Sequence, residues 1–213
     1  MLYARAHGSL NALPLPHADE IGVWHLLGHS VKDDLLTESF AWVIATYCRP
    51  HSDSFVPALG LDCAAFLNLL KTCFPHFTPP PRWLAAQSEV VGVDGVLDEF
   101  NDLLNLLLDH RAVADEHHRR VAHLVAAACM GNDHLWQDLG LPDRKALSIL
   151  LNTHFPALAA KNTGDMKWKK FFYKQLCERE GINACRAPSC AACGDYARCF
   201  GAEEGDAIFR IVR

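Results

Sequence analysis

The sequence predicts an all-α protein, a helical bundle with a cysteine-rich metal-cluster loop near its C-terminus. Apolar residues recur at helical spacing over most of the chain, and the runs end at proline or glycine, as helices do. The two stretches with a β-like pattern, residues 90–93 and 208–212, are too short to build a sheet alone. Four cysteines then gather within fifteen residues: Cys185, Cys190, Cys193 and Cys199.

The first two predicted helices have recognisable ends. Residues 33–48 open with acidic side chains, which stabilise a helix N-terminus, and the pattern ends before Arg49-Pro50. Residues 61–74 carry apolar side chains at positions 66, 67, 69, 70 and 73 and stop at Pro75. The three prolines at 79–81 predict a stiff connector to the next helix.

Four further helices are predicted downstream. Residues 96–108 are followed by residues 119–130, which end at Gly131-Asn132. Residues 147–155 stop at Pro156, and residues 165–180 stop at Gly181. Four apolar side chains of the last helix share one face and are expected in the core: Trp168, Phe171, Phe172 and Leu176.

Two parts of the body resemble each other. LGLDCAAFLNLLKTCFP at residues 59–75 matches LGLPDRKALSILLNTHFP at residues 139–156 with one inserted residue. Each segment follows a predicted helix that ends in cysteine, at Cys48 and Cys129 respectively. We interpret this as a duplicated two-helix unit, about 33–75 and 110–156, although leucine-rich helices can agree by chance.

Charge divides the chain at about residue 160. Residues 161–213 hold ten basic and seven acidic side chains, whereas residues 1–160 hold ten basic and eighteen acidic ones. We therefore expect a helical body, 1–160, packed as one globular unit with a basic helix and cysteine loop, 161–213. The net charge of −5 argues against nucleic acid as a partner.

The sequence also carries information on the cellular location and the functional class of the protein. The longest unbroken apolar run, residues 124–130, is too short for a membrane span, and no signal peptide is evident. Nine cysteines without an export signal argue for a reducing, cytoplasmic location. No nucleophile–base set, phosphate-binding glycine loop or pair of carboxylates stands out, which favours a carrier over an enzyme.

The cysteine spacing, C-x4-C-x2-C-x5-C, predicts a bound metal centre. A disulfide framework is the weaker alternative, because a domain of this size does not need such cross-links. Structural zinc usually takes two separated C-x2-C pairs, and only Cys190 and Cys193 form one here. The wider intervals favour an iron–sulfur cluster, whose corners are spread over a larger volume.

Other residues near the loop have two interpretations each. Lys167, Lys170 and Lys174 form a row that is either a solvated helix face or an electropositive strip for an oxyanion or acidic partner. Cys177 is either a spare ligand or a small buried side chain, and His134 is a candidate heterometal ligand.

The remaining cysteines and histidines are expected to be structural or solvated. Four cysteines in apolar helical contexts are predicted to lie in the core: Cys48, Cys63, Cys73 and Cys129. His110, His117 and His118 stand in polar surroundings and are predicted to face solvent.

Two family resemblances are visible in these residues. The loop is similar to the wider C-x6-C-x2-C-x5-C motif that closes the endonuclease III family of helical DNA glycosylases, but no helix–hairpin–helix glycine pattern is present. MKWKKFFYKQLCEREG at 166–181, the cysteine motif ending in CFG, and HLWQDLGLPDRKALSILLNTHFPALAAKNTGDM at 134–166 closely resemble the NifQ family of nitrogen-fixation proteins. That match runs from about His134 to Gly201.

The NifQ resemblance implies a molybdenum carrier for assembly of the nitrogenase iron–molybdenum cofactor. Proteins of this kind are understood to hold molybdenum on an iron–sulfur cluster, as a Mo–Fe–S centre. By the resemblance, Cys185, Cys190, Cys193 and Cys199 are the cluster ligands. The implied partners are molybdate and the cofactor assembly scaffold, the nitrogenase iron protein, or both of these proteins.

Two other functions compete with the carrier. An iron–sulfur redox sensor would hold iron but no molybdenum, and its partner binding would change with cluster oxidation. A structural zinc module on an interaction domain would be colourless and insensitive to air.

Overall fold

The structure is a computed structural model that describes residues 22–32, 34–48, 56–80, 94–182 and 190–203. The regular secondary structure of these residues is helical, as predicted. Its elements are α1 (Val23–Leu27), α2 (Leu35–Tyr47), η1 (Pro57–Gly60), α3 (Cys63–Cys73), α5 (Asp94–Asp109), α6 (Glu116–Cys129), α7 (Leu135–Asp138), α8 (Arg144–His154), α9 (Pro156–Ala159), α10 (Trp168–Arg179), η2 (Cys190–Ala192) and α11 (Tyr196–Phe200). Both β-like stretches, 90–93 and 208–212, lie outside the described residues.

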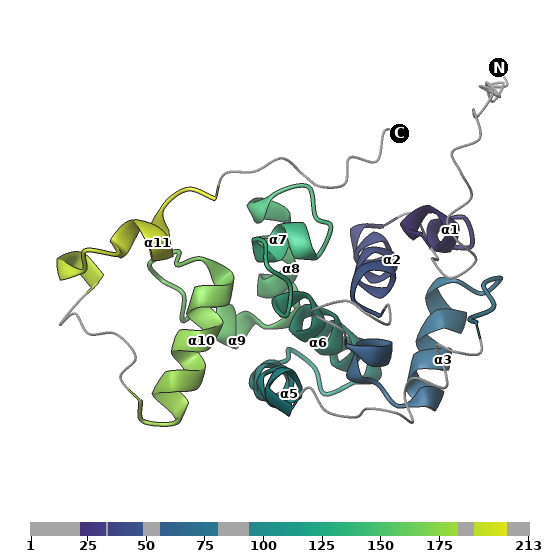
Figure 1. Cartoon of the computed structure of the whole chain (residues 1–213), viewed down its shortest axis with the longest axis horizontal. Coiled ribbons are helices and arrows are strands. Elements are labelled where there is room, and N and C mark those ends of the chain that lie inside the picture. The colour runs from purple at the N-terminus through teal and green to yellow at the C-terminus, as the bar shows by residue number, and fades with distance from the viewer. Residues whose placement is uncertain (1–21, 33, 49–55, 81–93, 183–189, 204–213) are drawn as a thin grey trace, which may run out of the picture.

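Helix α6 forms the centre of the bundle. Its nine residues from Val121 to Cys129 are all buried, which explains why the longest apolar run of the sequence lies here. Helices α2, α5, α7 and η1 pack around it (Figure 1). A helix that is apolar on every side belongs inside a bundle, and the alanines at 126–128 let its neighbours approach closely. Among the described residues, no helix is long and apolar enough to cross a membrane.

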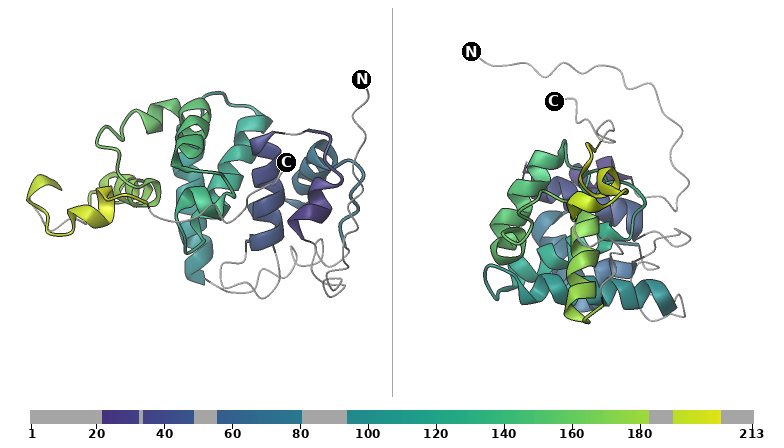
Figure 2. Two further views of the ribbon diagram at one scale, coloured as in Figure 1. Left: turned by 90° about the horizontal axis from the view of Figure 1, so that it is seen from above. Right: turned by 90° about the vertical axis from the view of Figure 1, so that its left-hand side faces the viewer.

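The molecule is elongated, with the cysteine segment at one end. Helices α1, α2 and α3 occupy one end of the long axis, and α10, η2 and α11 the other (Figures 1 and 2). Helix α10 packs on α5 and buries the aromatic side chains predicted for the core, Trp168, Phe171 and Phe172, while Leu176 packs at its edge. These side chains belong to the same hydrophobic cluster as the helices before residue 160.

Aspartates set the start of four helices. The carboxylates of Asp34, Asp62, Asp115 and Asp143 each accept a hydrogen bond from the backbone N–H three residues on, at 2.7–2.8 Å. Helix α10 has no side-chain cap and begins at 168, later than the predicted 165, because Asp165 has a φ of 53° and cannot continue a helix backward.

Matched local geometry supports the proposed duplication. The capping aspartates recur at one interval, from 34 to 115 and from 62 to 143. Gly60 and Gly140, before α3 and α8, both have positive φ, of 69° and 66°. Both helices are eleven residues long and end at a buried phenylalanine, Phe74 or Phe155, with φ of −136°. The duplication, like the division at residue 160, remains a proposal.

Two cysteines and two histidines differ from the prediction. Cys48 and Cys129 are buried and Cys73 is half-buried, but Cys63 is exposed, because it is the first residue of α3 and faces away from the bundle. His117 is exposed as predicted, whereas His110 and His118 are half-buried. His118 lies against His117 and the buried His154, with ring centroids 5.2–5.3 Å apart.

We expect His154 to make the fold sensitive to acid. Burial, and then the neighbouring His117 and His118, lower the pKa of His154 from 6.5 to about 4. Between these two values the unfolded chain binds a proton that the folded chain does not, so stability falls as the pH drops from 6.5 towards 4. After allowance for solvent screening around the exposed neighbours, the loss by pH 5 is about 1 kcal/mol. Urea unfolding at pH 7.5 and 5.0 measures it.

His154→Gln is the matched variant, because the glutamine side chain does not titrate. The difference in unfolding free energy between pH 7.5 and 5.0 should shrink by about 1 kcal/mol relative to the native protein. Burial also lowers the pKa of His123, so part of the pH dependence should persist in the variant. An unchanged pH dependence in His154→Gln would contradict the assignment.

Candidate metal centre

The cysteine loop lies at the surface and is tied to the body at its C-terminal end. Cys190 is exposed, and Cys193 and Cys199 are half-buried. The backbone N–H of Lys167 donates to the Cys199 carbonyl at 2.8 Å, and Cys199 and Phe200 pack against the hydrophobic core. The loop is therefore anchored directly before the first turn of α10.

An arginine holds the segment that follows the loop. Arg144, the first residue of α8, forms ion pairs with Glu203 at 2.5 Å and Asp165 at 2.8 Å, and donates to the Met166 carbonyl at 3.0 Å. The Glu203 side chain is 5% exposed, and its second oxygen, Oε2, is buried without a partner. A buried acceptor of this kind normally meets a donor, such as a water or a ligand.

The predicted ligand set is only partly described. Cys185 lies outside the described residues, and within the described part of the chain no three histidine, cysteine, aspartate or glutamate side chains could hold a metal ion. The three remaining cysteines nevertheless suit a cluster. They are free thiols that solvent can reach, and the Cys193 N–H donates to the Cys190 carbonyl at 3.1 Å in a tight turn. The assignment of all four as ligands stays a prediction.

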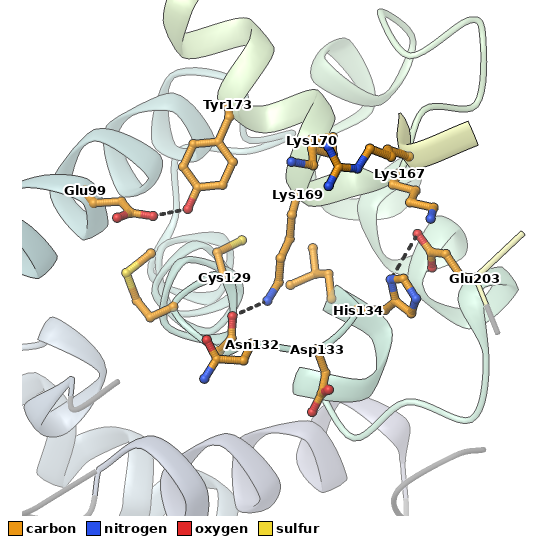
Figure 3. Close-up of a pocket in the computed structure, with 14 residues that line it drawn as sticks. Glu99, Cys129, Asn132, Asp133, His134, Lys167, Lys169, Lys170, Tyr173 and Glu203 are labelled. Atoms are coloured by element: carbon orange, nitrogen blue, oxygen red, sulfur yellow. Dashed lines mark hydrogen bonds and ion pairs between the residues drawn. The ribbon is translucent and has the colours of Figure 1, made fainter. Parts of the chain in front are cut away.

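A pocket of about 500 Å³ opens between α10 and the α6–α7 connection. Its polar and charged lining comes from α5 through Glu99, from residues 131–134, from α10, and from Arg198 and Glu203 on the loop side. Figure 3 shows Lys167 at the end near His134 and Glu203, and Tyr173 with Glu99 at the other end. The pocket thus joins the helical body to the cysteine segment.

The three lysines of the predicted row divide between its two interpretations. Lys167 and Lys170 line the pocket, but Lys174 does not, and it forms an ion pair with Glu178 one turn along α10. Lys169, which no sequence pattern singles out, lines the pocket instead. Its ammonium forms an ion pair with the buried Asp138 and donates to the Gly131 carbonyl at 2.7 Å.

The two candidate extra ligands, His134 and Cys177, lie in different surroundings. His134 precedes α7 and lines the pocket, with its Nδ1 3.9 Å from Glu203 Oε1. Cys177 is half-buried on α10 and does not line the pocket. Cys129, predicted as a core residue, does line it, but burial raises the pKa of its thiol to about 12, so at neutral pH it is not a thiolate.

Comparison with known proteins identifies the family. The NifQ family model matches residues 39–201, which include all four loop cysteines and every residue of the pocket except Glu203. This match spans most of the chain.

The chain belongs to the NifQ family.

Curated proteins of the NifQ family are similar to large parts of this chain. Protein NifQ of Azotobacter vinelandii is 45% identical over 152 residues, which cover 68% of this chain and 78% of that protein. The NifQ homolog of Sinorhizobium fredii is 49% identical over 149 residues, or 70% of this chain and 63% of that protein. Protein NifQ of Rhodobacter capsulatus is 43% identical over 95 residues, 45% of this chain and 53% of its own. No solved structure matches the chain.

Proposed function

We propose that this protein is a molybdenum carrier for nitrogen fixation, which supplies the metal for assembly of the nitrogenase iron–molybdenum cofactor. The observation that carries the proposal is the NifQ match across residues 39–201, which includes the complete cysteine motif. In this proposal the protein is a cytoplasmic carrier and not an enzyme, and its partners are molybdate, the cofactor assembly scaffold and the nitrogenase iron protein.

The proposed ligands are Cys185, Cys190, Cys193 and Cys199, and the group they hold is an iron–sulfur cluster. When bound, such a cluster supplies sulfide ligands and electrons, which turn molybdenum from a hard oxyanion into a thiophilic metal centre. The chain's own residues support this role. The segment that holds Cys190, Cys193 and Cys199 lies at one end of the molecule, where a partner can approach, and the anchored Cys199 fixes the loop to the body (Figure 2).

Elemental analysis tests the proposal directly. The protein is purified without oxygen from cells supplied with molybdate, and iron, sulfide, molybdenum and zinc are measured with the visible spectrum. We expect a brown protein with iron, sulfide and up to one molybdenum per chain. Iron without molybdenum would contradict the carrier function and favour a redox sensor. A colourless protein with zinc alone would contradict both.

A further inference from the structure

We infer that the pocket beside the cysteine loop is a binding site for a tetrahedral oxyanion dianion, separate from the cysteine ligands. This inference rests on the proposed function, in which the physiological ligand is molybdate. The pocket would hold the oxyanion close to the cysteines before the metal reaches sulfur. The side chains that would bind the oxyanion are Lys167, which precedes α10, Lys170 of α10 and Arg198 of α11.

The charges of these three side chains are available to a ligand. Within the described residues, the ammonium groups of Lys167 and Lys170 form no hydrogen bond or ion pair, although both line the cavity. Among the residues that the structure describes, Arg198 forms an ion pair with Asp195 alone, at 3.5 Å, and both side chains are more than two-thirds exposed. Such an exposed pair contributes little and can be exchanged for a better anion.

The other charges of the pocket are either paired or lie away from the three cations. Lys169 is paired with Asp138, and Glu203 with Arg144. Glu99 accepts a hydrogen bond from the Tyr173 hydroxyl at the far end of the pocket. Asp133 is exposed and points away from the lysines in Figure 3. The three available cations are therefore the charges that a ligand near α10 would meet.

The backbone adds to the positive potential at this position. Helix α10 is twelve residues long, its N-cap residue is Lys167, and its first turn holds neither an acidic residue nor a side-chain cap. The unsatisfied N–H groups and the helix dipole both favour an anion there. At about 30 Å³ per water, the cavity holds on the order of ten waters, enough for a hydrated oxyanion.

The unpartnered oxygen of Glu203 indicates that the pocket also offers an acceptor. A water that bridges Glu203 Oε2 to a bound oxyanion would satisfy both groups. The pocket is also continuous with the cysteine segment, because Arg198 directly precedes Cys199. The described loop cysteines themselves do not line the pocket, so the proposed oxyanion site is separate from the proposed cluster ligands.

The test is calorimetric titration of the full-length protein with sodium molybdate at low salt. We expect binding of one molybdate, competition by tungstate and sulfate, and little competition by perchlorate, a tetrahedral monoanion. The double variant Lys167→Gln/Lys170→Gln and the single variant Arg198→Gln should each weaken binding at least tenfold. The matched control, Lys174→Gln on the same helix, should bind within about twofold of the native protein.

Iron content separates this inference from the proposed function. In Cys193→Ser, molybdate binding should persist although iron is lost, whereas the lysine variants should keep their iron. No molybdate binding by the native protein, or unchanged binding in the double lysine variant, would overturn the pocket assignment while leaving the carrier function intact. Loss of molybdate binding together with iron in Cys193→Ser would also overturn it, because the oxyanion would then require the cluster.

Discussion

Replacing Asp138 with alanine is expected to destabilise the protein by about 3–5 kcal/mol, because it leaves a lysine without its counter-ion in a largely buried position. Asp138 is 3% exposed; its Oδ1 accepts a hydrogen bond from the Tyr47 hydroxyl at 2.6 Å, and its Oδ2 pairs with Lys169. The expected loss is a large part of the 5–15 kcal/mol that typically holds a domain together. The free energy of urea unfolding at pH 7.5 measures it.

Two companion variants make this prediction specific. Tyr47→Phe removes only the hydroxyl and should cost about 1–2 kcal/mol. Asp133→Ala removes an exposed carboxylate five residues away and should stay within about 0.5 kcal/mol of the native protein. If Asp138→Ala lost less than about 1 kcal/mol, the buried ion pair would not have the importance assigned to it. Tyr47→Phe would still report on the network if Asp138→Ala failed to fold.

The same ion pair connects the fold to the candidate site. Lys169 belongs to α10, Asp138 to α7 and Tyr47 to α2, so one buried carboxylate links three helices. Burial, and then the hydrogen bond to Asp138, raise the pKa of Tyr47 well above its ordinary value, so the phenol remains a donor at any physiological pH. Because Lys169 is fixed in this way, its neighbours on α10, Lys167 and Lys170, are positioned along the pocket.

The long helices could be predicted from the sequence because each carries a full apolar period and a chemical end signal. Their predicted limits agree with the structure to within three residues. The short elements α1, α7, α9 and α11 have four or five residues each and were not predicted, because so few residues show no period. The exposed Cys63 was wrongly placed in the core, since an apolar context does not tell which side of a helix end faces solvent.

The candidate site, too, could be predicted from the sequence only in part. Its cysteine motif is local in sequence and could be recognised directly, and so could Lys167 and Lys170. The ion pairs that shape the pocket join residues far apart in the chain, 31 positions for Lys169 and Asp138 and 59 for Arg144 and Glu203. No local sequence pattern predicts such contacts, because they form only when α7, α8 and α10 pack together. For Lys174 the sequence left two interpretations open, and its ion pair with Glu178 fits the solvated helix face.

The second large effect concerns the cysteine loop itself: Cys193→Ser should lower the iron content of anaerobically purified protein at least tenfold. Changes in residues that merely support a metal ligand cost 10–100-fold in affinity, so loss of a ligand should cost no less. Cys193 is half-buried at one end of the molecule, and hydroxyl for thiol changes little volume there. The far-ultraviolet circular dichroism should therefore stay near that of the native protein.

Cys63→Ser is the matched control, because Cys63 is an exposed thiol on α3, at the other end of the long axis. The Cys63→Ser variant should retain full iron. The iron content of Cys177→Ser decides whether the half-buried thiol on α10 is a further ligand. The same exchange at Cys185, Cys190 and Cys199 completes the set, and native iron content in any one variant removes that residue from the ligands. If Cys63→Ser lost as much iron as Cys193→Ser, the loss would reflect a general effect of thiol removal, and the four-cysteine assignment would fail.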